Sequence, residues 1–198
     1  MIISAPDSAD LLQAASWSVT DSLPYDSTYL DGKFGAWLEG NAVVTPDGNV
    51  ADLLRVDYAP GPEYAALIRL RDSVSFDRST LKRFRPDDRE EPKSLQVRYD
   101  SLSGRYWSLV NYVTQEWAGK QNPAWVRNTL ALSSSPNLQE WTVHRTVLHH
   151  PDIAKHGFQY ADWLFDGNDI VLLSRTAYDD NGTGAHNCHD ANYMTFHR

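Results

Sequence analysis

The stretch WLEGNAVVTPDGNVADLLR, residues 37–55, carries the pattern that decides the fold. Two apolar runs, 40–44 and 50–57, flank the turn sequence TPDGN at 45–49. An apolar run, a turn rich in Asp and Gly, and a second apolar run are typical of a β-hairpin. The same signal returns at 95–112 and at 160–176. The hairpin is therefore a unit that recurs along the chain.

Nearly every other apolar run is also short, rich in β-branched or aromatic residues, and bounded by Gly, Pro, Asn or Asp. A helical turn or two is expected only at 9–15, and the charge run RPDDREEPKS at 85–94 is typical of a solvated loop. The sequence therefore predicts an all-β protein. Its predicted strands are 17–20, 40–44, 50–57, 65–70, 95–99, 106–112, 128–133, 141–148, 160–165, 170–176 and 193–197, with a further one within 73–84.

The hairpins are each followed by one or two further strands, so the chain divides into units of four strands. Such repeats are typical of β-propeller blades, which bury their faces against neighbouring blades. We expect residues 1–198 to form a single partial propeller domain: outer strands of one blade in 1–30, blades at 31–92 and 93–150, and a last blade at 151–198. Since closed propellers have about four to eight blades, this one is incomplete.

Open blade edges predict either self-association or support from further blades. The alternative is that the strands near Trp17 fold back, cap one end and leave a monomer.

Composition excludes several partners. Of 198 residues, 41% are hydrophobic and 22% charged, with a net charge of −8. This acidic balance disfavours nucleic acid and membranes. No stretch approaches the ~20 apolar residues of a membrane helix, and MIISAPDSADLL at the start lacks the features of a signal peptide. We expect a soluble chain; the single Cys188 cannot form an internal disulfide and leaves the compartment open, a periplasmic or secreted parent protein included.

Several polar residues are predicted to converge on one face. In a propeller blade the innermost strand starts on the face where the second strand ends and the third begins. That geometry brings together Glu39, Arg55, Arg127, Tyr160 and Arg175, with His186 and His189 in the loop that follows.

The order Glu39, Arg55, Arg127, Tyr160 resembles the propeller-type sialidases, the glycoside hydrolases with BNR or Asp-box repeats. LEGNAVVTPDG…LLR is similar to a glutamate–arginine hairpin of that family, and QYADWLFDG at 159–167 is similar to its tyrosine strand. SSSPNLQEW at 133–141 resembles an Asp-box turn that lacks the Asp and the Gly. The resemblance covers residues 30–198 and implies the C-terminal half of a divergent sialidase-like enzyme acting on a terminal acidic sugar.

The resemblance also implies roles. Arginine offers a planar fork of donors to a sugar carboxylate, which suits Arg55 and Arg127. Tyr160 would be the nucleophile and Glu39 the base that activates it; sialidases are the glycosidases with a tyrosine nucleophile. Neither a metal nor a cofactor is expected. The remaining candidate substrate-binding residues are Arg175, Trp37, His156, His186, His189 and Asp190.

Some features depart from the family. Its first arginine and its acid/base aspartate belong to N-terminal blades that this chain lacks, and SRT at 174–176 puts Arg175 where a glutamate is expected. The stretch TAYDDNGTGAHNCHDANY at 176–193 is not typical of sialidases. Two alternatives therefore stay open: a glycan-binding propeller module without catalysis, and a hydrolase or lyase of another acidic glycan that uses the loop of His186 and His189, with a metal as one option.

Overall fold

The computed structural model describes residues 1–58, 64–70, 76–77, 81–83, 90–91, 96–182 and 184–198. The chain is mostly β-strand, arranged in four antiparallel sheets, so the all-β prediction is confirmed. No helix in the described part is long and apolar enough to span a membrane. The elements are β1 (Ile3–Ser4), η1 (Ala14–Ser16), β2 (Ser18–Val19), α1 (Tyr29–Gly32), β3 (Phe34–Val44), β4 (Val50–Tyr58), β5 (Tyr64–Leu70), β6 (Phe76–Asp77), β7 (Leu81–Arg83), β8 (Glu90–Glu91), β9 (Val97–Asp100), β10 (Arg105–Tyr112), η2 (Pro123–Trp125), β11 (Thr129–Ser135), β12 (Thr142–His149), β13 (Gly157–Asp166), β14 (Asp169–Ala177) and β15 (Tyr193–His197).

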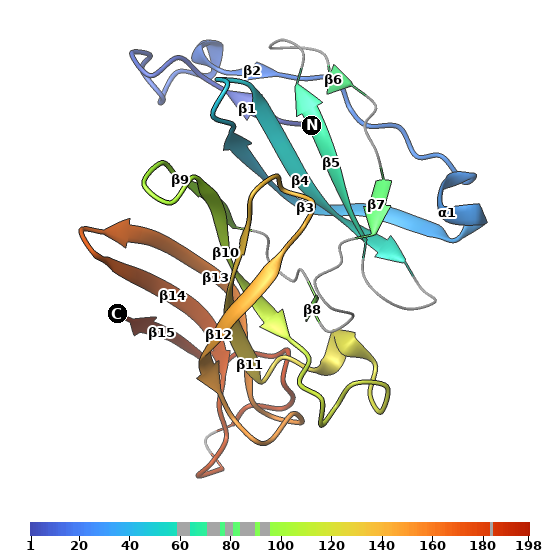
Figure 1. Ribbon diagram of the computed structural model, residues 1–198, viewed down its shortest axis with the longest axis vertical. Coiled ribbons are helices and arrows are strands. Elements are labelled where there is room, and N and C mark those ends of the chain that lie inside the picture. Colours follow the sequence, from blue (N-terminus) through green and yellow to red (C-terminus); the bar gives the residue numbers. More distant parts are fainter. Residues whose placement is uncertain (59–63, 71–75, 78–80, 84–89, 92–95, 183) are drawn as a thin grey trace.

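The three larger sheets follow one another along the chain (Figure 1). The first has the order β3-β4-β5-β6, with β7 also on β5; the second is β12-β11-β10-β8, with β9 also on β10; the third is β13-β14-β15. Neighbouring sheets contact each other: β3 of the first contacts β9 of the second, and β13 of the third contacts β10 and β11 of the second. None of the sheets closes on itself. The propeller architecture stays a prediction.

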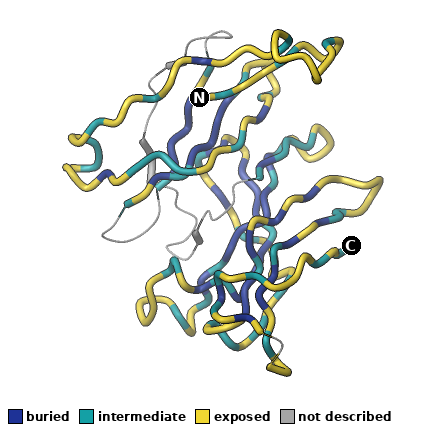
Figure 2. The backbone as a smooth tube through the Cα atoms, turned by 180° about the vertical axis from the view of Figure 1, so that it is seen from behind, coloured by how far each residue is buried: buried dark blue, intermediate teal, exposed yellow. Residues whose placement is uncertain are grey.

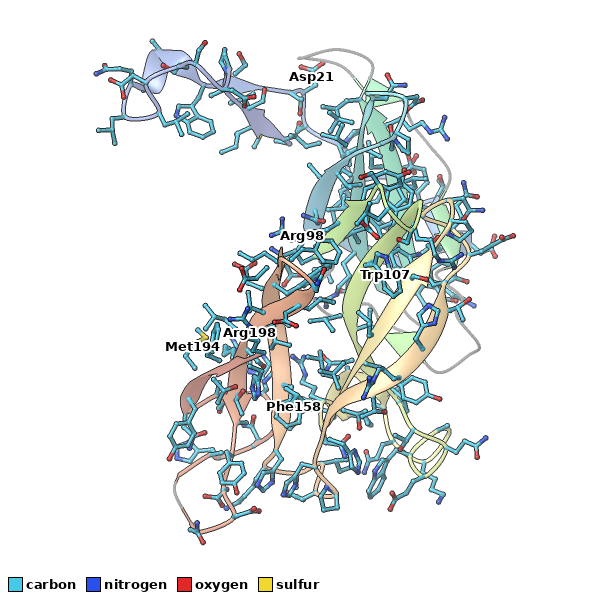
Figure 3. The ribbon with its side chains drawn as sticks, turned by 60° about the vertical axis from the view of Figure 1, so that its left-hand side comes forward. Asp21, Arg98, Trp107, Phe158, Met194 and Arg198 are labelled. Carbon is cyan, nitrogen blue, oxygen red and sulfur yellow. The ribbon has the colours of Figure 1, made fainter. Side chains whose placement is uncertain are left out.

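The N-terminal strands form a separate sheet. β1 and β2 pair with each other, Ile3 opposite Val19, and in the described residues with no other strand. Figure 3 shows this segment standing away from the rest of the chain. Most of its residues are exposed, Leu12 and Trp17 among them, as the yellow tube of the N-terminal part in Figure 2 illustrates. The self-association expected from open edges also stays a prediction.

Several predicted boundaries were wrong. The strand predicted at 40–44 begins at Phe34, since a bulge carries its pairing with β4 past Glu39. The helical turn predicted at 9–15 is a 3₁₀ turn at 14–16, and the short helix at 29–32 was missed. The loop predicted at 85–94 contains β8, although 84–89 and 92–95 lie outside the described residues. Of the residues 73–84, where a further strand was predicted, the structure describes only those of β6 and β7.

The first hairpin forms where its turn sequence predicts. The Thr45 amide donates to the Asn49 carbonyl at 2.8 Å and closes the turn. Gly48 has φ = +80°, a conformation that costs glycine little and other residues more. The two runs around the turn then pair from Val44 opposite Val50 up to Gly40 opposite Leu54. The apolar stretch VADLLRV is thus fixed as the second strand of the sheet.

The core lies between the sheets. Alternate residues of β4 point to opposite faces: Leu53 faces the second sheet with Val97 and Tyr106, whereas Leu54 and Val56 face the aromatic residues near α1. Both faces of β4 are therefore covered, which explains its nearly continuous apolar run.

The second and third sheets share a further cluster. Leu109 and Leu130 pack there against Ala161, Trp163 and Leu172. The Arg98 side chain, labelled in Figure 3, also joins these sheets by donating from Nε to the Trp163 carbonyl at 2.6 Å.

Replacing Leu109 by alanine should lower the free energy of unfolding by about 2–5 kcal/mol, because its 2%-exposed side chain fills the space between two sheets. Leu102→Ala is the matched control, since Leu102 is 97% exposed and its loss should change little. Urea denaturation of both variants measures the difference. Equal effects of the two substitutions would show that the packing of these sheets is not as described.

Two carboxyl groups in the first hairpin should influence stability with opposite signs. Burial raises the pKa of Asp52, opposed by the Met1 amino group, so its ionised form is disfavoured in the folded chain. Hydrogen bonds from Thr45 and Asn49 lower the pKa of Asp47. At neutral pH, Asp52→Asn should therefore raise the free energy of unfolding and Asp47→Asn should lower it. The Asp52 difference should vanish as the pH falls below about 3.9, its unfolded value. Denaturation series over pH check both signs; the same sign for both would contradict this electrostatic account.

Candidate active site

Two bulges, each in the first strand of a sheet, position the central residues. In the first hairpin Trp37 pairs with Val56 and Gly40 with Leu54, so 38 and 39 together face Arg55. In the third sheet Gln159 pairs with Arg175 and Asp162 with Leu173, so 160 and 161 together face 174. Bulges redirect side chains and are frequent beside functional sites. Glu39 and Tyr160 thus each lie in a β-bulge.

The backbone of Tyr160 is strained as well. Its φ is +47°, in the left-handed region that a bulky residue adopts rarely and at a cost. Its side chain is 38% exposed, so the strain is not explained by burial of the ring. The conformation aims the phenol across to another sheet.

The phenol of Tyr160 meets a charged pair there. Its hydroxyl donates to Glu39 Oε1 at 3.3 Å, and Glu39 Oε2 accepts from Arg55 Nη1 at 2.8 Å. Tyr160 and Glu39 are 121 residues apart in the chain. The Arg55 side chain is only 15% exposed, whereas that of Glu39 is 53% exposed. The structure therefore brings together three residues predicted to share one face, with the carboxylate open to solvent.

Arg175 completes this group from β14. Its guanidinium carbon lies 4.7 Å from the centre of the Tyr160 ring, close enough for a cation–π interaction. Its Nη2 donates to the His189 carbonyl at 2.8 Å and to Gln159 Oε1 at 3.3 Å. These contacts hold a positive charge against the tyrosine ring.

Arg127 contacts Gln159, the residue before Tyr160 in the chain. Its Nη1 donates to Gln159 Oε1 and its Nε to the Ala124 carbonyl at 3.1 Å. Gln159 is 1% exposed and accepts from both Arg127 and Arg175. This glutamine, which sequence reasoning missed, connects two of the predicted arginines directly beside the tyrosine. It lies one residue before the strand predicted at 160–165 and carried no signal of its own in the sequence.

The loop after β14 rests on the same strand. Gln159 Nε2 donates to the Cys188 carbonyl at 2.7 Å. Only glycine fits at 157, because a Cβ there would lie 2.4 Å from that same carbonyl. His189 Nδ1 lies 3.1 Å from Asp190 Oδ1, and this hydrogen bond is the main cause that lowers the pKa of Asp190. A shallow pocket of about 490 Å³ lies here, lined by Arg175, His189, Asp190 and residues 191–194. His186 is exposed in the same loop.

Two predicted residues lie elsewhere. Trp37 packs on Phe34, with ring centres 4.7 Å apart, and donates from Nε1 to the Pro24 carbonyl, so its contacts are those of a core aromatic residue. His156 is buried and contacts Asp152 at 2.7 Å in the loop before β13. In the described residues, one group of three could hold a metal ion, and it consists of His150, His156 and Asp180. It does not include His186 or His189.

No protein-family model matches this chain, and no curated protein matches it either.

Proposed function

We propose that the chain is part of a sialidase-like glycoside hydrolase that acts on a terminal acidic sugar. The observation that carries the proposal is the contact of the Tyr160 phenol with the Glu39–Arg55 ion pair. Glu39 and Arg55 come from the first sheet and Tyr160 from the third, 121 residues after Glu39, in the order typical of propeller-type sialidases. The succession of antiparallel sheets along the chain supports the sialidase-type propeller that this function needs.

The proposed chemistry uses Tyr160 as the nucleophile. Glu39 accepts the phenol proton while Tyr160 Oη forms a bond to the anomeric carbon and the glycosidic C–O bond breaks; the leaving oxygen takes a proton from solvent. Water then displaces the tyrosine and releases one proton to solvent, and Glu39 returns its proton to the phenol oxygen. A neutral phenol suits an anomeric centre that carries a carboxylate, because a second carboxylate would be repelled as it approached.

The arginines supply the binding energy for the sugar carboxylate. Arg55 donates from Nη1 to Glu39, and its guanidinium places at the site a positive charge that attracts an anion. Arg175 adds a second positive charge beside the tyrosine ring. Arg127 acts through Gln159 in this proposal, since both arginines donate to the same amide oxygen.

The second candidate is a glycan-binding module without catalysis. Two observations favour it: Arg175 stands where the family has a glutamate, and no residue of the sequence was matched to the family's acid/base aspartate. Such a module would bind the carboxylate but would not cleave the glycosidic bond.

A panel of 4-methylumbelliferyl glycosides separates the two. The panel contains an α-sialoside, a β-glucuronide and a β-galactoside as the neutral control. Because the aryl leaving group needs little protonation, release of fluorescence does not depend on the acid/base aspartate. Cleavage of an acidic glycoside but not of the galactoside supports the hydrolase. Calorimetric binding of sialic or glucuronic acid without cleavage supports the module. If the chain shows no binding and no cleavage, both candidate functions are contradicted.

A further inference from the structure

Two loops meet at the end of the third sheet where β13 begins and β14 ends. His150 and His156 come from the loop between β12 and β13, and Asp180 comes from the loop after β14. Nε2 of each histidine lies 3.1 Å from Asp180 Oδ1. The two imidazole rings are stacked, with centres 3.5 Å apart and planes inclined by 13°. One carboxylate oxygen therefore faces two parallel rings.

These distances match the ligand shell of a small metal ion. The three candidate ligand atoms all lie within 4.8 Å of one another. Around a tetrahedral Zn²⁺ with bonds of about 2.0–2.2 Å, ligand atoms are separated by roughly 3.3 Å. The two measured nitrogen–oxygen separations of 3.1 Å are close to that spacing.

A second layer of groups orients two of the ligands. Asp152 Oδ2 accepts from His156 Nδ1 at 2.7 Å, which leaves His156 Nε2 unprotonated; this nitrogen accepts from the Asp179 amide and lies 3.1 Å from Asp180 Oδ1. The Tyr178 hydroxyl donates to Asp180 Oδ2 at 2.7 Å, so Oδ1 is the oxygen turned toward the histidines. Asp152 itself accepts from the amides of Ala154 and Lys155, each at 3.0 Å. A carboxylate behind a ligating histidine is a common feature of zinc sites.

We propose that His150, His156 and Asp180 bind a divalent transition-metal ion, for which Zn²⁺ is the best match. Two imidazole nitrogens and one carboxylate oxygen favour zinc over calcium or magnesium, which prefer shells of oxygen. Three protein ligands leave a fourth position for water or another ligand. This inference does not depend on the proposed glycosidase function.

Metal binding must rearrange two hydrogen bonds, and this gives the proposal a signature. The Asp152 amide donates to His150 Nδ1 and the Asp179 amide donates to His156 Nε2, each at 3.1 Å. When a metal binds His156 Nε2, the Asp179 amide loses its hydrogen-bond acceptor. When a metal binds His150 Nε2, the ring proton of His150 must move to Nδ1, so the Asp152 amide loses its acceptor as well. Both amides should therefore change their environment when metal binds.

The experiment uses the full chain without a histidine tag, stripped with EDTA and titrated calorimetrically with ZnCl₂. We expect one Zn²⁺ per chain at micromolar metal and a higher melting temperature when it is bound. Asp180→Asn and His150→Gln should abolish this binding, Asp152→Asn should weaken it about 10- to 100-fold, and the control His144→Gln should leave it unchanged. Backbone NMR should show the amides of 152 and 179 among the largest shifts.

Other outcomes would overturn the proposal. These are absence of stoichiometric binding at micromolar zinc, binding that survives Asp180→Asn, and binding that is lost instead in His186→Gln or His189→Gln. Asp180 is about half exposed, so Asp180→Asn should fold normally. An unchanged melting temperature of this variant in EDTA verifies that it does.

Discussion

Replacing Tyr160 by phenylalanine is expected to reduce the turnover of an activated acidic glycoside by roughly 10³-fold or more, as removal of a nucleophile does in other hydrolases. The phenylalanine ring keeps its place under the Arg175 guanidinium, so only the hydroxyl that contacts Glu39 is removed. Binding of the sugar should therefore change far less than turnover. Steady-state kinetics with the fluorogenic glycoside, together with calorimetric titration of the free sugar, measure the two effects separately.

Tyr25→Phe is the control for this variant. Tyr25 is 62% exposed and lies outside the candidate site, so its hydroxyl should not matter for turnover. If Tyr160→Phe retained the activity of the unmodified chain, Tyr160 would not be the nucleophile, whichever sugar is cleaved.

Replacing Arg55 by lysine is expected to weaken binding of the acidic sugar about 10- to 100-fold, because hydrogen bonds to charged groups contribute about 1.5–3 kcal/mol. Lysine keeps the positive charge but loses the planar arrangement of donors with which arginine binds a carboxylate. The 15% exposure of the Arg55 side chain means that its charge is little screened by solvent. Calorimetric titration with sialic and glucuronic acids measures the loss.

Arg145→Lys provides the comparison for this substitution. Arg145 is exposed on β12, an outer strand of the second sheet, and the same change there should leave binding intact. Equal affinity in the Arg55→Lys and Arg145→Lys variants would place the carboxylate site somewhere other than beside Glu39.

Local sequence patterns predicted the strands well where turn and apolar residues agree. TPDGN at 45–49 determines both the turn and the register of β3 and β4, so the hairpin followed from local residues alone. The strand over 193–197 was also predicted with its observed bounds. The bulges at 38–39 and 160–161 were not predicted, because an extra residue in a strand leaves the alternation of apolar residues almost unchanged until the pairing is known.

The candidate site was predicted only in part for a similar reason. Glu39, Arg55 and Tyr160 do meet, and their order in the sequence was the signal; Arg175, which joins them, was expected on the same face. Trp37 was predicted to stack on a sugar, but its ring packs on Phe34. That packing depends on how the segment before β3 folds back.

The cluster of His150, His156 and Asp180 was not predicted; His156 alone was named, as a substrate-binding residue. Its members come from two loops that only the pairing of β13 with β14 brings together. The spacing of His186 and His189 was the more conspicuous metal pattern in sequence, yet in the described residues it gathers no third ligand.

The most direct test of the central claim, that Tyr160 attacks an acidic sugar, is trapping with 2,3-difluorosialic acid followed by mass spectrometry. Fluoride leaves without protonation, so formation of the adduct needs the nucleophile and the carboxylate site but not the acid/base aspartate. The account predicts one glycosyl group per chain, located by peptide fragmentation on Tyr160 and absent from the Tyr160→Phe variant. An adduct on another residue, or cleavage of the fluorogenic sialoside with no adduct at all, would contradict it.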